Sequence, residues 1–204
     1  MEKTKNERNI KIILVGGETK DRFDFSDKWA KNIYSDEKKS YIDSQLSVKE
    51  VEIEGEKFIV NLWVYYSTDL NLTLTKIFTI NSLGVVYLTE EDDEKSLNNI
   101  RMIKRHIDEN CKFEDGSTLP SILIETKTSN ESKLKEFAVQ NKIDSVFKVS
   151  IKEGTNVNES MDYLLNIINK RMKASIGWDN YFNKPERNNI ILNSKKKTQK
   201  EKGC

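Results

Sequence analysis

Short apolar runs alternate with amphipathic segments along most of the chain. The run at residues 10–15 is β-branched and is followed at once by Gly16-Gly17, which predicts a buried strand that ends in a turn. The next apolar residues recur at roughly helical spacing and predict an amphipathic helix: Phe23, Phe25, Trp29 and Ile33. This order of strand and helix is the opening of a βα unit.

The remaining pattern predicts a mixed sheet covered by helices. Two apolar runs surround Glu54-Gly55-Glu56 and predict a β-hairpin, and apolar residues between 70 and 80 predict a helix or an irregular segment. Further strands are expected at 83–88, 120–124 and 143–149, and helices around the apolar stripes at 97–107, 134–138 and 157–172. One hairpin followed by alternating strands and helices predicts an α/β fold, whose sheet is mostly parallel with one antiparallel edge strand.

Ligands of such sheets bind beyond the carboxyl ends of the strands. A site is therefore expected in the turns that follow these residues: Val15, Val64, Leu88, Ile124 and Val149.

Composition narrows the classes of function. Lys and Arg total 34 against 33 Asp and Glu, so the net charge of +1 gives no whole-molecule field for nucleic acid. No apolar run reaches the ~18 residues of a membrane helix, and no signal region follows the charged start, so we expect a soluble, cytoplasmic protein. Cys111 and Cys204 are far apart and His106 lies in a charged helical segment, so no disulfide, metal site or His-based catalysis is expected.

The apolar periodicity fades after Met172, where the chain becomes rich in Asn and Lys. Such a segment lacks the apolar content to fold by itself. We expect an N-terminal arm at residues 1–8, one domain at 9–173 and a flexible tail at 174–204.

Four stretches between residues 9 and 173 resemble motifs of the Ras superfamily of small GTPases, and within it the Rab family. They lie at residues 11–16, 53–63, 84–100 and 150–157, and are similar to the family's KIxLVG, DGK-xxLxIW, GxxxVYD…SFxNI and SAKxxxNV. The resemblance implies a small G domain of the P-loop NTPase type. That domain has a mostly parallel six-stranded sheet with one antiparallel edge strand and helices on both faces.

The phosphate-binding motif of that family is degenerate here. The motif GxxxxGK[ST] uses backbone N–H groups and a Lys to hold phosphates, and a hydroxyl to hold magnesium. Gly16 is retained, but Asp21, Arg22 and Phe23 stand at the positions of the second Gly, the Lys and the hydroxyl. An aromatic ring cannot ligate a hard cation, so no metal site is expected.

The catalytic and switch motifs are also replaced. The family's D-x-x-G, which serves the metal and the γ-phosphate, falls at residues 64–67, where Val64 and Ser67 stand at its ends. The position of the water-orienting Gln holds Thr68, and the first switch threonine is replaced by Tyr41. No catalytic residue is therefore assigned.

The base-recognition motif N-K-x-D corresponds to residues 126–129, with Thr126, Lys127 and Ser129. Ser129 cannot accept both guanine donors as an Asp does. Some residues remain compatible with a nucleotide: Gly16, Arg22, Lys127, Ser150 and Lys152. For most of these a structural role is the simpler interpretation: a strand-ending glycine, a lysine stem over apolar surface and a strand-to-helix turn.

These replacements should remove a large part of the free energy of nucleotide binding. Each charge-assisted hydrogen bond lost is worth ~1.5–3 kcal/mol. Losing three or four, with Asp21 repelling phosphate, is expected to subtract on the order of 6–10 kcal/mol, or roughly 10⁴- to 10⁷-fold in affinity. Arg22 remains able in principle to hold a phosphate weakly without magnesium.

Two further features concern partners. The aromatic residues Tyr41, Trp63, Tyr65 and Tyr66 form either a partner-binding patch on the former switch face or part of the core. The acidic run at residues 90–94 is interpreted as a solvated helix cap. The basic tail ends in one cysteine, Cys204, which is either lipidated, for peripheral membrane association, or incidental in a disordered tail.

Three hypotheses follow from this resemblance. The leading one is a Rab-like protein that has lost magnesium-dependent GTP binding and hydrolysis and acts as a protein-binding module in membrane traffic, on the cytosolic face of an internal membrane. It needs no cofactor and no nucleic acid. The second is a divergent but working switch, which binds GTP or GDP with magnesium, and the third is a structural subunit of a larger assembly.

Overall fold

Six strands form one sheet in the order β2-β3-β1-β4-β5-β6 in the computed structural model, which describes residues 8–36, 44–65, 79–90, 92–127 and 131–184. The strands are β1 (Asn9–Gly16), β2 (Ser44–Ile53), β3 (Glu56–Tyr65), β4 (Gly84–Thr89), β5 (Ser121–Glu125) and β6 (Ser145–Lys148). Strand β2 runs antiparallel to β3, and the other neighbours are parallel. This confirms the predicted α/β fold with one antiparallel edge strand, the small-GTPase type of fold.

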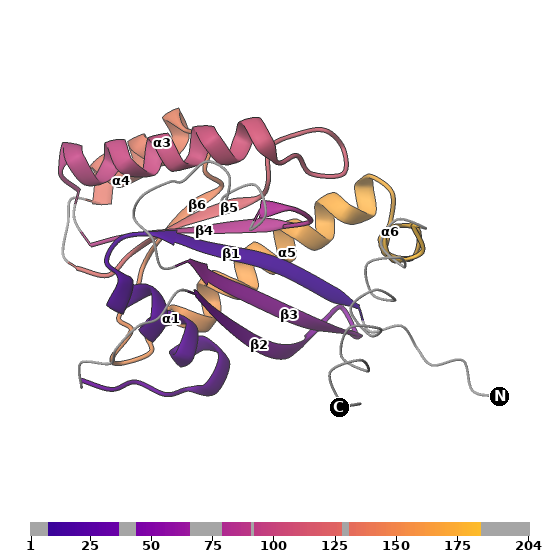
Figure 1. Ribbon diagram of the computed structural model, residues 1–204, viewed down its shortest axis with the longest axis horizontal. Coiled ribbons are helices and arrows are strands. Elements are labelled where there is room, and N and C mark those ends of the chain that lie inside the picture. Colours follow the sequence, from indigo (N-terminus) through magenta and orange to yellow (C-terminus); the bar gives the residue numbers. More distant parts are fainter. Residues whose placement is uncertain (1–7, 37–43, 66–78, 91, 128–130, 185–204) are drawn as a thin grey trace, which may run out of the picture.

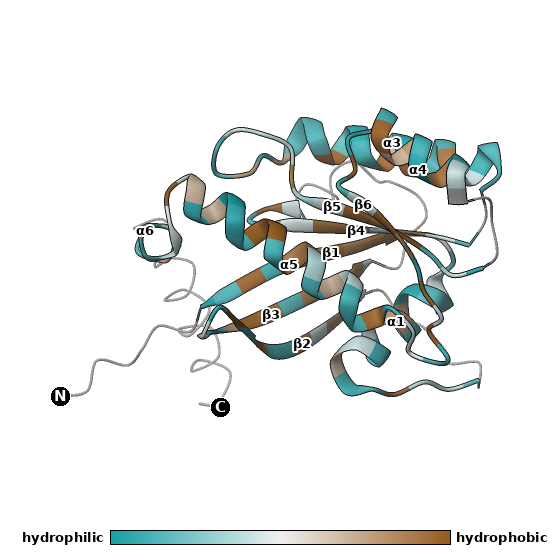
Figure 2. Ribbon diagram, turned by 180° about the vertical axis from the view of Figure 1, so that it is seen from behind, coloured by the Kyte–Doolittle hydropathy of each residue, from teal (hydrophilic) through white to brown (hydrophobic). Residues whose placement is uncertain are grey.

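Helices cover both faces of the sheet. They are α1 (Thr19–Lys31), α3 (Glu94–Asn110), α4 (Glu131–Gln140), α5 (Val157–Ala174) and the short α6 (Trp178–Phe182). Helices α3 and α4 lie on one face (Figure 1), and α1 and α5 lie on the other, which faces the viewer in Figure 2. Within the described part of the chain, none of these helices has the length and apolar character needed to cross a bilayer.

The core follows the periodicity of the sequence. All six residues of β4 are buried, as expected for a strand covered on both faces. The central strands are mostly hydrophobic in Figure 2, whereas much of the edge strand β2 is hydrophilic. The apolar stripe of α3 is confirmed, because Leu97, Ile100, Ile103 and Ile107 are all buried. The hairpin between β2 and β3 turns at Glu54 and Gly55, whose positive φ angles of 52° and 82° match the turn that joins twisted strands.

Helix α1 ends before the last apolar residue predicted for it. Asn32 has a left-handed conformation (φ 56°), and its N–H donates to the carbonyl of Lys28. Such a residue stops a helix. Ile33 consequently lies outside α1 and is 50% exposed, so its predicted place on the apolar face was wrong.

The domain extends further than the sequence predicts. Residues 174–184 were expected to belong to a flexible tail, but α6 packs its aromatic side chains against the sheet and α5. The Trp178 ring lies 4.9 Å from that of Phe58, and its Nε1 donates to Oδ1 of Asn169 (2.8 Å). Asp179 accepts a hydrogen bond from Arg8 (2.8 Å), which joins the two ends of the described chain. The tail prediction is therefore wrong for residues 174–184.

Some predictions fall outside the described residues. These are most of the arm at residues 1–7, most of the predicted segment at 70–80, and the tail from 185 to 204.

Candidate functional site

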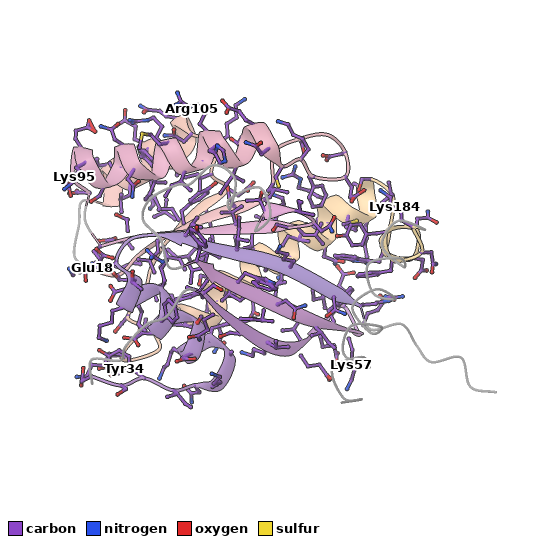
Figure 3. All side chains as sticks on the ribbon, in the orientation of Figure 1. Glu18, Tyr34, Lys57, Lys95, Arg105 and Lys184 are labelled. Atoms are coloured by element: carbon purple, nitrogen blue, oxygen red, sulfur yellow. The ribbon has the colours of Figure 1, made fainter. Side chains whose placement is uncertain are left out.

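The carboxyl ends of the parallel strands gather at one end of the molecule. Figure 3 labels Glu18 and Tyr34 at this end and Lys57 and Lys184 at the opposite end. Strand β1 ends at Gly16, and α1 begins at Thr19 after only Gly17 and Glu18. The three replaced motif positions, at 21–23, are therefore helical residues.

Gly16 has a structural reason to be glycine. Its φ is 87°, and a Cβ atom there would lie 2.6 Å from the carbonyl oxygen of Leu88 in the neighbouring strand β4. Positive φ and a close backbone both exclude side chains. The structural interpretation of Gly16 is sufficient by itself.

Arg22 is almost completely buried, with 1% of its surface exposed. Its Nη1 donates to the carbonyl oxygens of Gly16 and Gly17 (2.5 Å each) and its Nε to the carbonyl oxygen of Tyr65 (3.1 Å). Its Nη2 donates to Oγ1 of Thr19 (3.1 Å). Burial lowers the pKa of the guanidinium to about 10, so it is still charged at neutral pH. The phosphate-loop position thus holds a cation whose donors point at protein oxygens.

The other replaced positions near Arg22 also contact protein atoms. Asp21 accepts a hydrogen bond from Oγ1 of Thr126 (3.0 Å), which connects α1 to the chain after β5. Phe23 and Val64 are buried in the core, at 6% and 0% exposure. These side chains contribute packing and a polar cross-link.

Glu90, which follows β4, places a carboxylate beside the start of α1. It accepts a hydrogen bond from the backbone N–H of Glu18. Burial and the nearby charges of Asp21 and Glu18 raise the pKa of the Glu90 carboxyl. It lines a groove of about 900 Å³ between residues 17–18, the end of β4 and α3, whose charged lining also includes Glu18, Asp93 and Lys95. This groove is more acidic than basic.

Lys152, which the resemblance places on the nucleotide side, belongs to a group that we call the Tyr34 cluster: Lys20, Tyr34, Asp36 and Lys152. Oδ2 of Asp36 lies 3.0 Å from Nζ of Lys152, and Oδ1 accepts a hydrogen bond from the Tyr34 hydroxyl (3.0 Å). The ammonium groups of Lys20 and Lys152 lie 5.2 and 5.9 Å from the centre of the Tyr34 ring. The bond from Lys152 lowers the pKa of Asp36, and that bond raises the pKa of Lys152.

The remaining residues predicted to contact a nucleotide, Lys127 and Ser150, make no hydrogen bond with each other in the described part of the chain. Lys127 is exposed after β5. The N–H of Ser150 donates to the carbonyl of Thr155 (3.2 Å), and its Oγ accepts from the N–H of Glu153 (3.3 Å), as in an ordinary turn. Several predicted positions lie outside the described residues: Tyr41, Tyr66, Ser67, Thr68, Ser129 and Cys204.

A second surface lies on the β2–β3 side of the sheet. Leu46 and Val48 are 44% and 51% exposed, and Leu46 is the cross-strand partner of Trp63. Trp63 is half-buried, and Nζ of Lys11 lies 5.2 Å from its ring centre. We call Leu46, Val48 and Trp63 the apolar sheet patch. Leu46 and Val48 were not predicted as site residues. They lie two residues apart on either side of buried Ser47, and this alternation along the strand places them on its outward face.

No group of three or more His, Cys, Asp or Glu side chains is arranged to hold a metal ion in the parts of the chain that the structure describes.

Comparison with known proteins relates this fold to a family. No model of a protein family matches the chain. It is 22% identical to the GTP-binding protein YPT1 of Saccharomyces cerevisiae over 202 residues, which cover 96% of each chain. It is 24% identical to the Ras-related protein Rab-13 of Bos taurus over 203 residues, 94% of each chain, and 24% identical to Rab-32C of Dictyostelium discoideum over 167 residues, 78% of this chain and 73% of that protein. These similarities support a place in the Rab/Ras superfamily.

Proposed function

We propose that this chain is a Rab-like protein that keeps the small-GTPase fold, does not depend on magnesium and GTP, and acts as a protein-binding module in membrane traffic. The observation that carries the proposal is the buried guanidinium of Arg22, whose donors are directed at the carbonyl oxygens of Gly16, Gly17 and Tyr65. A phosphate would have to draw Arg22 away from these acceptors. Each buried hydrogen bond so broken costs about 1–3 kcal/mol.

Electrostatics at the start of α1 supports the same proposal. The phosphates of GTP carry several negative charges, and the first turn of α1 and its surroundings present Glu18, Asp21 and Glu90. Burial is the main cause of the raised pKa of Glu90, and the nearby charges of Asp21 and Glu18 raise that pKa further. Additional anionic charge is therefore disfavoured at this place.

The Tyr34 cluster also supports the proposal that no nucleotide is needed. Lys152 is one of the residues that the family resemblance reserves for the nucleotide, and here its ammonium group pairs with Asp36. This pair is exposed and weak by itself. It nevertheless shows that the positive charge has a protein partner, so no bound nucleotide is needed to satisfy it.

The apolar sheet patch is the surface that we propose for protein partners. Exposed aliphatic side chains beside an aromatic residue are typical of interface cores. The proposed face includes Trp63 and Tyr65, together with Tyr41 and Tyr66 outside the described residues. The basic tail with Cys204 is proposed to add peripheral attachment to the cytosolic face of an internal membrane.

A titration tests the loss of nucleotide binding. Fluorescent GDP and GTP analogues are added to the full chain with and without Mg²⁺, and the reference is the variant Asp21→Gly/Arg22→Lys/Phe23→Ser, which restores the residue types of the motif. Following the estimated loss of roughly 10⁴-fold or more, the native chain should show no saturation at micromolar analogue. Tight binding that requires Mg²⁺ would instead favour a divergent working switch.

A further inference from the structure

Arg22 connects two strands at the point where their pairing stops. The parallel ladder between β1 and β3 ends with the pair of Leu14 and Val64. Just beyond that pair, Nη1 of Arg22 contacts the carbonyl oxygen of Gly16 (2.5 Å) and Nε contacts that of Tyr65 (3.1 Å). One guanidinium therefore continues the link between these two chain segments after the ladder has ended.

The geometry of this link suits arginine specifically. A guanidinium presents its donors in a rigid planar fork on three nitrogen atoms, and here all three are used. A lysine has one nitrogen on a flexible stem, which cannot reach acceptors spread in this way. Because Arg22 is buried, with 1% exposed surface, water does not easily take over its hydrogen bonds.

The link matters for the partner face. Tyr65 is the last residue of β3, two positions after Trp63 of the apolar sheet patch. The chain continues directly into residues 66–68, which correspond to the end of the family's D-x-x-G motif and its Gln and are called the former switch segment. In ligand-driven GTPases, contacts to the γ-phosphate order such a segment and its loss releases it. Here the backbone oxygen at the start of this segment is held by a side chain of the same protein.

We propose that Arg22 is a positioning residue that permanently fixes the end of β3, and with it Trp63 and Tyr65 of the proposed partner-binding face, in one conformation without any bound ligand. The inference rests on the proposed function for the role of that face. It assigns the protein a constitutive mode of regulation: partner binding does not respond to nucleotide but does respond to the integrity of the Arg22 contacts.

Amide hydrogen exchange of the full chain tests the proposal. In Arg22→Ala, peptides covering residues 14–18 and 62–65 should exchange at least ~10-fold faster, as expected when charge-assisted hydrogen bonds are lost, while peptides of α5 should be unchanged. Arg22→Lys keeps the charge without the fork and should lose protection in the same two segments. Arg101→Ala, which removes an arginine on α3 that contacts Asn98, is the matched control and should change neither segment.

Chemical rescue separates positioning from a general loss of stability. Millimolar guanidinium chloride, far below denaturing concentration, should restore protection of both segments in Arg22→Ala, while ammonium chloride should not. If Arg22→Ala does not fold, Arg22→Lys carries the test by its exchange pattern alone. Unchanged exchange in the folded variants, or equal acceleration throughout the molecule, would overturn the proposal.

The failure of this inference is distinguishable from the failure of the proposed function. Nucleotide content is measured on the same protein preparations. Guanine nucleotide in the native chain would contradict the proposed function, whereas a nucleotide-free chain whose two segments ignore Arg22 would contradict the positioning role only.

Discussion

Three consecutive residues near the start of α1, at positions 21–23, differ from the phosphate-binding motif and make contacts within the protein. The replacements Asp21, Arg22 and Phe23 are visible against the motif, and their residue types already argue against magnesium. Three of the acceptors of Arg22 are not visible, because they are backbone oxygens of Gly16, Gly17 and Tyr65, which no side-chain pattern encodes. The sequence therefore reveals which motif residues are replaced, but not the contacts that Arg22 makes in their place.

Glu90 gives a prediction on pH dependence. Its pKa is raised in the folded chain, chiefly by burial, so the folded chain holds this proton more tightly than the unfolded chain. The free energy of unfolding should then fall as pH rises from the ordinary value of 4.5 through the raised pKa. Glu90→Gln keeps an oxygen for the Glu18 N–H but has no carboxyl to titrate. In urea unfolding, the free energy of unfolding of this variant relative to the native chain should therefore increase over the same pH range.

Asp36→Asn is the matched control for this measurement. The Lys152 bond lowers the pKa of Asp36 from 3.8, so its contribution changes only below that pH. The difference in the free energy of unfolding between Asp36→Asn and the native chain should not change with pH above 4.5, the ordinary pKa of Glu90. A flat difference for Glu90→Gln as well would show that the Glu90 carboxyl is not perturbed.

At the scale of elements, periodicity was a good guide where segments are long. The buried strands and the apolar stripes of α3 and α5 are all recovered, because each repeats its pattern over several residues. Helix α6 has only five residues, too few for a periodic signal. Its position depends on the bulk of Trp178 and Tyr181 and on contacts with Phe58 and Asn169, which are distant in sequence.

Truncations test the importance of α6. A chain that ends at residue 173 loses the buried aromatic side chains of Trp178 and Tyr181 and should be less stable by ~3–5 kcal/mol or more. A chain that ends at residue 184 retains α6 and should unfold at nearly the same urea concentration as the full chain. Equal stability of both truncations would contradict the packing role of α6.

Strand β2 supplies a test of the partner face. Leu46→Lys/Val48→Lys changes two exposed side chains and should alter stability by less than ~1 kcal/mol. When the tagged chain is isolated from its own cells, native mass spectrometry should give the mass of a complex. The variant should give a mass near that of a single chain, 23.8 kDa. Ile33→Lys changes an equally exposed aliphatic residue elsewhere and should leave the complex intact.

The whole molecule combines a retained scaffold with altered strand-end chemistry. The sheet order and the similarity to Rab proteins over more than nine-tenths of the chain place the fold, but a fold does not determine function. Function depends on the site, where the side chains of Arg22, Asp21 and Lys152 make hydrogen bonds with other residues of the same chain. We therefore propose that the molecule is complete without a nucleotide.

The most direct test is the nucleotide content of the purified full chain. The protein is isolated in buffer with Mg²⁺, denatured, and the supernatant is resolved by ion-exchange chromatography with a guanine-nucleotide standard. We expect far less than one guanine nucleotide per chain and no change in thermal stability when EDTA is added. One GDP or GTP per chain, released by EDTA with a fall in melting temperature, would contradict it.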